Sequence, residues 1–372
     1  MNTITPRIFV AATHQDDGKT TTSLGLFSAL KKRLGRIGYI KPVGQRFIDV
    51  EGKLIDEDTV LIDETYGVQT PLEAMSPIAV EPDFTRRYIE KGGSEALITR
   101  IRNSFDRAAW EKEFAIIEGT GHAGVGSVFD LSNARVASLL QSKVLIVTKG
   151  GIGKPIDEIA LNKALFDKEG VEVVGVILNK VLPEKFDYIA DFARRGLGRL
   201  GIDLLGVLPV DPVLAKPTLQ QVCDEISGRF LSGIRNWGRR HIARVIIGAM
   251  SSVNLTPQFR PGTLIITPGD REDILRSALA AHSPHEGRPL HVAGFVLSTD
   301  HLPSETIIRR LSEAGIPIIA SQLDSYTVAS RIHSMTVKTV PGDTQKIEAI
   351  QSLIDKHVEI DRLLQKIGAS VP

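Results

Sequence analysis

Three consecutive residues near the N-terminus, Gly18, Lys19 and Thr20, have the types and the order needed to bind phosphate. They follow a short apolar run, Ile8 to Ala12, and precede apolar residues at helical spacing, which predicts a strand, a loop and a helix. In such a loop, backbone N–H groups and the positive end of the helix surround an anion, the lysine reaches the outer phosphates, and the threonine ligates Mg²⁺. The sequence therefore predicts a phosphate-binding loop. The residues expected to contact nucleotide there are Thr13, His14, Gln15, Asp16, Asp17, Gly18, Lys19, Thr20 and Thr21.

The loop departs from the usual pattern at its first glycine. The common form has a glycine five positions before Gly18, where this chain has Thr13, and a form one residue longer would place it at Ala12. A strand, turn and helix that merely contain Gly-Lys-Thr are therefore the alternative interpretation. The carboxylates that follow in the chain favour the phosphate loop. Asp16 and Asp17 either face solvent or help to place Mg²⁺ or a substrate amine.

A second set of candidates lies at the ends of predicted strands. A strand over about 36–40 ends at Lys41-Pro42-Val43, and its carboxyl end should open onto the same crevice as the loop. Lys41 is therefore either a substrate contact or a surface lysine before a turn. The apolar strand 114–117 ends in Glu118 and glycines, which favours Glu118 as a Mg²⁺ ligand.

The acidic stretch at 56–58 offers another ligand. Asp56, Glu57 and Asp58 lie where a loop should enter a helix, so either they are acids that favour the helix dipole or one of them is a ligand of Mg²⁺. Residues 69–92 are rich in proline and should form an ordered loop over the site, before a helix over about 93–110.

The remaining pattern predicts a parallel α/β sheet. Strands at 144–148, 171–178 and 203–208 alternate with helices at about 155–168 and 185–200, which indicates helices on both faces. Asn179 follows one of these strands, and it either pairs with the adenine edge of a nucleotide or caps a turn.

A second, smaller α/β region should follow a weakly patterned segment around Trp237. Strands are expected at 242–249, 263–267, 291–297 and 316–320, with helices at about 271–283, 303–314 and 324–335, and a helical tail over 344–367. Asp270 is best interpreted as a helix-capping acid, with a ligand role as the alternative. His282, His285 and His291 have no acidic or cysteine residues around them, so a metal site is not favoured there.

The composition describes an ordinary globular chain. With 372 residues, 42% hydrophobic and a net charge of +1, the chain can bury a core over two domains and has no charge excess for nucleic acid or an anionic membrane. The single cysteine, Cys223, fits a reducing compartment. No signal peptide or membrane-spanning run is evident, so we expect a cytoplasmic protein.

These motifs, in this order, resemble the dethiobiotin synthetase family of phosphate-loop enzymes over roughly the first 215 residues. The matching pieces are Gly18-Lys19-Thr20, Lys41-Pro42-Val43, Asp58, Glu118-Gly119-Thr120-Gly121 and Asn179. The resemblance implies that the loop binds ATP, that Thr20, Asp58 and Glu118 hold Mg²⁺, and that Lys41 contacts substrate.

The second region, with Arg260-Pro261-Gly262-Thr263 and Pro268-Gly269-Asp270-Arg271, resembles the DRTGG domain. The pair in this order resembles the N-terminal portion of long bacterial phosphate acetyltransferases, in which the two domains precede the acetyltransferase domain and are regulatory. The printed sequence ends before such a domain would begin, so we expect no acetyltransferase activity from it alone. The resemblance also implies a homodimer.

The domain organisation predicted from this resemblance has four parts. An ATP-binding domain occupies 1–220, a linker 221–240, a DRTGG-like domain 241–345 and a helical tail 346–372. The first hypothesis for function is an Mg²⁺- and ATP-dependent enzyme that activates a carboxylate or carbamate by phosphoryl transfer, with Lys19 and Lys41 as catalytic residues. The alternative is a nucleotide-sensing regulatory ATPase with little turnover, which acts on a metabolic partner.

Overall fold

The chain folds as two compact units. The computed structural model describes residues 2–231, 237–282 and 292–369. The first unit comprises the chain up to Asp211 together with the segment from Thr339 onward, and the second comprises Pro212–Lys338. The second unit is therefore an insertion in the first. His285 and His291 lie outside the described residues.

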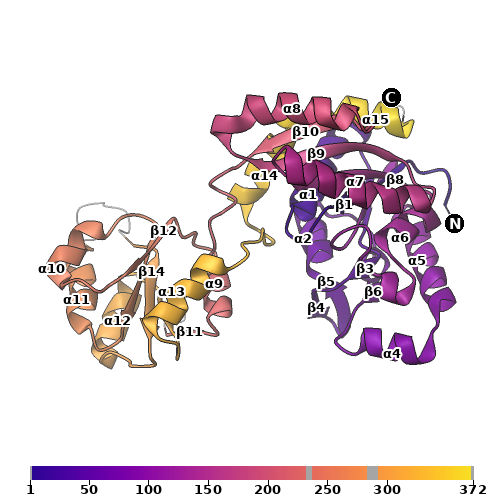
Figure 1. Ribbon diagram of the computed structural model, residues 1–372. Coiled ribbons are helices and arrows are strands. Elements are labelled where there is room, and N and C mark those ends of the chain that lie inside the picture. The colour runs from indigo at the N-terminus through magenta and orange to yellow at the C-terminus, as the bar shows by residue number, and fades with distance from the viewer. Residues whose placement is uncertain (1, 232–236, 283–291, 370–372) are drawn as a thin grey trace. The chain divides into compact units, whose positions relative to one another are not determined.

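A six-stranded parallel sheet forms the centre of the first unit (Figure 1). This sheet, with helices on both faces, confirms the predicted fold class. All six strands are almost wholly buried. Their sequences are therefore continuous apolar runs and do not alternate between apolar and polar residues. In spatial order the strands are β10 (Leu204–Pro209), β9 (Val173–Val181), β8 (Lys143–Lys149), β1 (Arg7–Ala12), β7 (Phe114–Glu118) and β2 (Ile37–Ile40).

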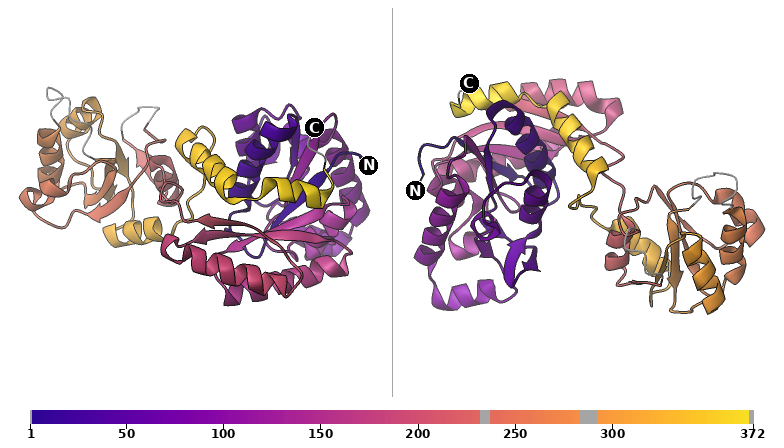
Figure 2. Two further views of the ribbon diagram at one scale, coloured as in Figure 1. Left: turned by 90° about the horizontal axis from the view of Figure 1, so that it is seen from above. Right: turned by 180° about the vertical axis from the view of Figure 1, so that it is seen from behind.

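Helices cover both faces of this sheet (Figure 2). On one face, Phe9 and Ala11 belong to a core shared with α5 (Ser94–Ala108), α6 (Asn133–Leu139), α7 (Gly153–Lys168) and α8 (Phe186–Gly198). Side chains alternate along a strand, so Ile8 and Val10 face the other side. That side is covered by α1 (Lys19–Leu34), α14 (Thr344–His357) and α15 (Ile360–Ile367).

The C-terminal segment packs directly on the helix that follows the phosphate loop. α14 lies along α1, and the approach is so close that a Cβ on Gly25 would come 2.2 Å from the side chain of Ile354. The predicted tail is one continuous helix, whereas the chain breaks at Val358, which forms a bridge with Gly206 of β10. The tail is thus part of the first unit.

The chain between β2 and β7 forms a small layer of its own. A hairpin of β4 (Phe47–Val50) and β5 (Lys53–Asp56) leads into α2 (Glu57–Tyr66). The segment 69–92, predicted to be an ordered loop, instead contains two short helices and a two-residue strand. The remaining elements of this layer are β3 (Val43–Gly44), α3 (Leu72–Met75), β6 (Ile78–Ala79) and α4 (Phe84–Lys91).

The second unit is a five-stranded sheet with helices on both faces (Figure 1). Its strands are, in spatial order, β11 (Arg229–Phe230), β15 (Ile318–Ala320), β14 (Gly294–Ser298), β13 (Thr263–Pro268) and β12 (Arg244–Ile247). β12 to β15 run parallel and neighbour one another in chain order, while β11 is antiparallel. One face carries α10 (Ser252–Leu255), α11 (Glu272–Ala281) and α12 (Glu305–Glu313), and the other carries α9 (Leu219–Glu225) and α13 (Ser325–Ser334).

The segment expected to be a linker contains two of these elements. α9 begins with a capping box, in which Thr218 and Gln221 exchange side-chain and backbone hydrogen bonds, and its apolar face packs in the core of the second unit.

Among the described residues, no helix is long and apolar enough to cross a membrane.

Candidate functional site

The topology of the first sheet places a crevice beside the phosphate loop. The connection from β1 leads toward β7 and β2, whereas the connections after β8 lead away to β9 and β10, so the strand order reverses at the β1–β8 pair. In open α/β sheets, ligands bind outside the carboxyl ends of the strands at such a reversal. The loop after β1 therefore lies where a nucleotide would be expected.

Gly18 ends this loop and begins α1 in a backbone conformation that glycine favours. Its φ is 103°, in the left-handed region, and a Cβ there would come 2.0 Å from Nδ2 of Asn179. No side chain caps the N-terminus of α1, so its first N–H groups have no side-chain acceptor. An anion would satisfy them.

Asp17 faces inward and braces the loop, whereas Asp16 is exposed. The Asp17 carboxylate accepts hydrogen bonds from the Thr13 hydroxyl and from the backbone N–H of His14, both at 2.7 Å. The Thr13 hydroxyl also lies 2.7 Å from that of Thr148 on β8. Because the His14 N–H is already bonded, it does not face a ligand in this conformation.

The other predicted loop residues lie around this brace. Asp16 has φ 63°, and its carbonyl accepts a hydrogen bond from Nζ of Lys180. The imidazole of His14 lies 2.9 Å from a carboxylate oxygen of Glu158 on α7. Gln15 is exposed, and Thr21 lies in the first turn of α1. Their contacts with nucleotide stay predictions.

Lys19 folds back over the loop. Its Nζ lies 3.5 Å from the backbone carbonyl of His14, and the side chain is largely buried. Burial lowers the pKa of Lys19, and the negative charge of Glu118 opposes that shift. The amine is thus placed above the start of α1, where it can reach a phosphate bound there.

Asn179 contacts the loop from the end of β9. Its amide Nδ2 donates to the carbonyl of Asp17 at 2.9 Å, and its Oδ1 accepts from the N–H of Lys180. Both ends of the amide are therefore engaged in holding the turn. A role at the adenine edge stays a prediction.

Glu118 lies at the carboxyl end of β7, next to Thr20. One carboxylate oxygen accepts from the Thr20 hydroxyl at 2.9 Å, and the other accepts from the Tyr39 hydroxyl at 3.0 Å. Burial raises the pKa of Glu118 to about 7, Asp58 adds to the shift, and Lys41 opposes it. The structure thus brings together two of the three predicted magnesium ligands.

Lys41 lies among three carboxylates. Its Nζ is 2.9 Å from Asp56 Oδ1, pairs with Asp58 Oδ2, and is 3.9 Å from Glu118 Oε1. Burial alone would lower the pKa of Lys41, but the carboxylates of Asp58, Asp56 and Glu118 raise it well above its ordinary value. The amine is therefore a permanent cation, held at the site and not a surface lysine.

Lys41, the three carboxylates around it, Thr20 and Tyr39 form one cluster, and its oxygen donors fit a hard divalent cation. Thr20, Asp58 and Glu118 supply hydroxyl and carboxylate oxygens, the ligand types that Mg²⁺ takes together with phosphate oxygens. Within the described ranges, no group of three or more histidine, cysteine, aspartate or glutamate side chains is arranged to hold a metal by itself. Phosphate oxygens would complete the coordination of a cation held by Thr20, Asp58 and Glu118.

Two members of the cluster were not singled out from the sequence. Asp56 was part of an acidic stretch, but its position as the cap of α2, with its side chain accepting from the N–H of Asp58, was not foreseen. Tyr39 belongs to a predicted strand. A buried tyrosine hydroxyl needs a hydrogen-bond partner, and this requirement could have indicated that Tyr39 contacts a polar group.

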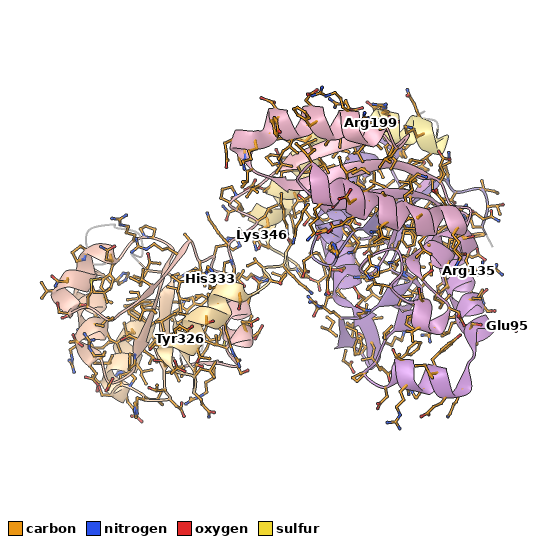
Figure 3. The ribbon with its side chains drawn as sticks, viewed as in Figure 1. Glu95, Arg135, Arg199, Tyr326, His333 and Lys346 are labelled. Carbon is orange, nitrogen blue, oxygen red and sulfur yellow. The ribbon has the colours of Figure 1, made fainter. Side chains whose placement is uncertain are left out.

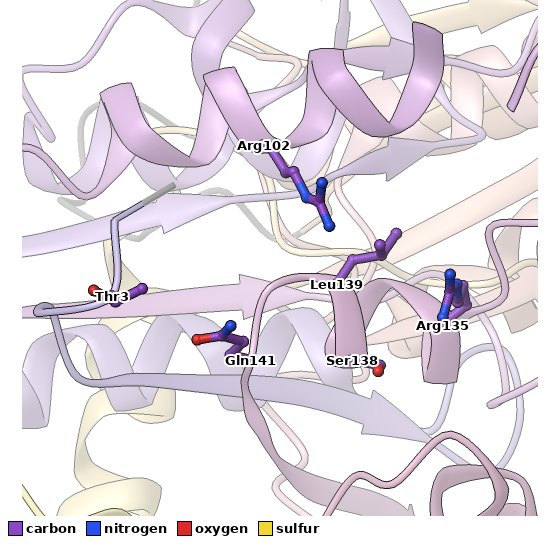
Figure 4. A pocket seen from close by; sticks show the side chains of 6 residues that line it. All are labelled: Thr3, Arg102, Arg135, Ser138, Leu139 and Gln141. Atoms are coloured by element: carbon purple, nitrogen blue, oxygen red, sulfur yellow. The ribbon is translucent and has the colours of Figure 1, made fainter. Parts of the chain in front are cut away.

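A separate cavity of about 440 Å³ lies at the opposite end of the sheet (Figure 4). Arg102 of α5 and Arg135 of α6 contribute to its wall, and Figure 3 shows Arg135 on one flank of the first unit. Arg135 also pairs with Glu169 at 3.6 Å. The cavity is near the segments that enter β1 and β8, so it is remote from the phosphate loop. It is lined by Thr3, Arg102, Arg135, Ser138, Leu139 and Gln141.

Fold and site together define the first unit as a P-loop domain of the NTPase type. The chain belongs to the AAA_26 family, described as an AAA domain, whose profile matches residues 6–218. The profile of the DRTGG domain matches residues 221–335. The predicted succession of a P-loop domain and a DRTGG domain is thereby confirmed.

The same succession occurs in phosphate acetyltransferases. The chain is 28% identical to that of Pseudomonas aeruginosa, over 97% of its own length and 52% of the relative's. It is also 28% identical to that of Pseudomonas putida, with the same coverage. The chain thus spans about half the length of the curated relatives it matches. Among solved structures, the MinC:MinD cell division protein complex of Aquifex aeolicus aligns at 15% identity and a TM-score of 0.36, over 56% of this chain and 83% of that one.

Proposed function

We propose that the chain is a regulatory module that binds Mg²⁺ and ATP in its first unit and signals the bound state to a metabolic partner. The observation that carries this proposal is the contact of Thr20 with Glu118 beneath a loop that ends in Gly18 and Lys19. This arrangement offers phosphate ligands and a carboxylate at one strand edge. The matched half of the phosphate acetyltransferases has the same two domains, which supports a role alongside a metabolic enzyme.

The contacts already made by Lys41 and by the backbone N–H of His14 favour a nucleotide sensor over an enzyme that turns ATP over rapidly. Lys41, the expected substrate contact, is engaged by Asp56 and Asp58, and the His14 N–H is occupied by Asp17. Both groups would have to be released before they could stabilise a transferring phosphoryl group. We therefore expect nucleotide to bind and to be hydrolysed slowly.

The second candidate is an enzyme of dethiobiotin-synthetase type. It is favoured by the presence of Lys41 and two acids at the same sheet edge as the loop. In that reaction a carboxylate or carbamate oxygen would attack the γ-phosphorus of ATP, the bond to the β-phosphate oxygen would break, and an acyl or carbamoyl phosphate and ADP would form. Homodimer formation remains a proposal from the family resemblance.

Isothermal titration with ATP, in the presence and absence of Mg²⁺, tests the first proposal. Lys19→Ala should weaken ATP binding at least about tenfold, since it removes a charge-assisted contact to phosphate. Lys163→Ala is the matched control, because Lys163 pairs with Asp167 on the surface of α7. Equal ATP affinity in wild type and Lys19→Ala would refute nucleotide binding by this loop.

The rate of ADP release separates the two candidates. The purified protein is assayed with ATP and Mg²⁺ alone, then with a diamine plus bicarbonate and with a panel of carboxylate metabolites. A slow rate that no compound raises supports the sensor. A compound that raises a Lys19-dependent rate many-fold would establish the enzyme and identify its substrate class.

A further inference from the structure

We propose that Lys41 is a built-in counter-ion, which occupies the cation position of the metal-free site and is displaced from Asp58 and Glu118 when a divalent cation binds. The proposal rests on the proposed function and describes how that same site is regulated. It assigns Lys41 a positioning role that precedes any contact with substrate.

The contacts of Lys41 define the position. Its ammonium group pairs with Asp58 and lies 3.9 Å from Glu118, the two carboxylates that would ligate the metal together with Thr20. A divalent cation at those oxygens and the ammonium group would therefore share the same partners. Because both are cations, their occupancies at the two carboxylates exclude one another.

The burial of the cluster explains why a cation is needed without metal. The side chains of Asp56 and Glu118 are each 1% exposed, and that of Lys41 is 8% exposed. Buried carboxylates without a counter-charge are costly, so the amine stabilises the fold. One ammonium among three carboxylates still leaves an excess of negative charge if all are ionised, which attracts a cation of higher charge.

Asp56 supplies a partner for the displaced amine. Its Oδ1 lies 2.9 Å from Nζ of Lys41. Its Oδ2 is buried and has no hydrogen-bond partner. Asp56 is not among the proposed metal ligands. The amine can therefore keep Asp56 as its partner after Asp58 and Glu118 turn to the metal, which leaves Lys41 charged and close to an incoming anion.

Mn²⁺ binding measured by electron paramagnetic resonance, without nucleotide, tests this exchange. Lys41→Met removes the competing charge and should raise the Mn²⁺ affinity at least about tenfold over wild type. Lys41→Arg keeps the charge and should stay near wild type. Lys163→Met removes one positive charge far from the cluster, and it should also stay near wild type. An Mn²⁺ affinity of Lys41→Met equal to or below that of wild type would overturn the proposal.

A second variant keeps the proposal testable if circular dichroism shows that Lys41→Met does not fold. Asp56→Asn retains an oxygen to cap α2 but removes the charge that receives the amine, so Lys41 should hold Asp58 more firmly and Mn²⁺ affinity should fall several-fold. An unchanged or higher Mn²⁺ affinity in Asp56→Asn would contradict the exchange. Equal ATP affinity of wild type and Lys19→Ala in the presence of Mg²⁺ would mean that the proposed nucleotide site is wrong, whatever the Mn²⁺ result, so the two failures can be told apart.

Discussion

The two units both contain a parallel sheet, yet among the described residues only the first buries charged side chains at the carboxyl ends of its strands. In the first unit the strand order reverses at β1 and β8, so neighbouring loops diverge and leave room for Lys19, Lys41 and Glu118. In the second unit, β12 to β15 follow one another in chain order and no reversal occurs among them. The comparison teaches that the order of the strands, more than the number of strands, decides which sheet edge can hold a ligand.

The loops at the edge of the second sheet close on one another. A Cβ on Gly269 would come 1.7 Å from the carbonyl oxygen of His301, so the loops after β13 and β14 are in direct contact. Arg271 bonds to Asp273 and to the carbonyl of Met250, which ties the loops after β12 and β13 together. These contacts hold the loops after β12, β13 and β14 together and so stabilise the fold of the second unit. The prediction that Asp270 caps the following helix is wrong, because the N-cap of α11 is Arg271, no side chain caps this helix, and its first-turn acids are Glu272 and Asp273.

The largest expected difference comes from substituting one glycine in each edge. Gly18→Val forces a β-branched side chain into left-handed backbone and against Asn179, so ATP affinity should fall at least about a hundredfold. Gly269→Ala should lower the free energy of unfolding by about 1–3 kcal/mol and leave ATP affinity unchanged.

Titration calorimetry and thermal melting measure the two effects of this glycine pair. The contrast would be lost if Gly269→Ala weakened ATP binding as strongly as Gly18→Val does. A folded Gly18→Val protein that bound ATP like wild type would likewise contradict the assignment of the loop.

The second expected difference is in the pH dependence of stability. The pKa of Glu118 is raised from an ordinary 4.5 to about 7, so the folded state binds the extra proton and the free energy of unfolding should fall as pH rises through that interval. The pKa of Asp273 is instead lowered from 3.8 to about 2 by its bonds with Arg271, so its contribution is lost as pH falls through that lower interval. The two edges should therefore lose stability at opposite ends of the pH range.

Denaturant unfolding in EDTA, followed from pH 4 to 8, checks the first half of this contrast. Glu118→Gln should abolish most of the decline between pH 4.5 and 7, an effect of at most about 3 kcal/mol. Asp273→Asn should leave that decline in place. An unchanged slope in Glu118→Gln would show that another group titrates.

The sequence predicted the first sheet well because its strands are buried on both faces and stand out as apolar runs between helical patterns. It also predicted that Glu118 and Lys41 lie at strand ends near the loop. It could not predict that Lys41 binds the acids, since the pairing joins residues from β5, α2 and β7 that meet only in the folded chain. The packing of α14 on Gly25 was equally hidden, because it joins the two ends of the sequence across an inserted unit.

The smallest expected effect concerns the two neighbouring acids of the loop, which the sequence does not distinguish. Asp17 is buried and holds Thr13 and the His14 N–H, whereas Asp16 is exposed. Asp17→Asn keeps a carbonyl oxygen as an acceptor but removes a buried negative charge beside the phosphate position, so ATP should bind a few-fold more tightly, roughly three- to tenfold. Asp16→Asn removes a charge that water screens, and its effect on ATP affinity should be smaller. Titrations at low and high salt measure both, and an equal gain from the two variants would show that the inward bond of Asp17 has no influence on the nucleotide.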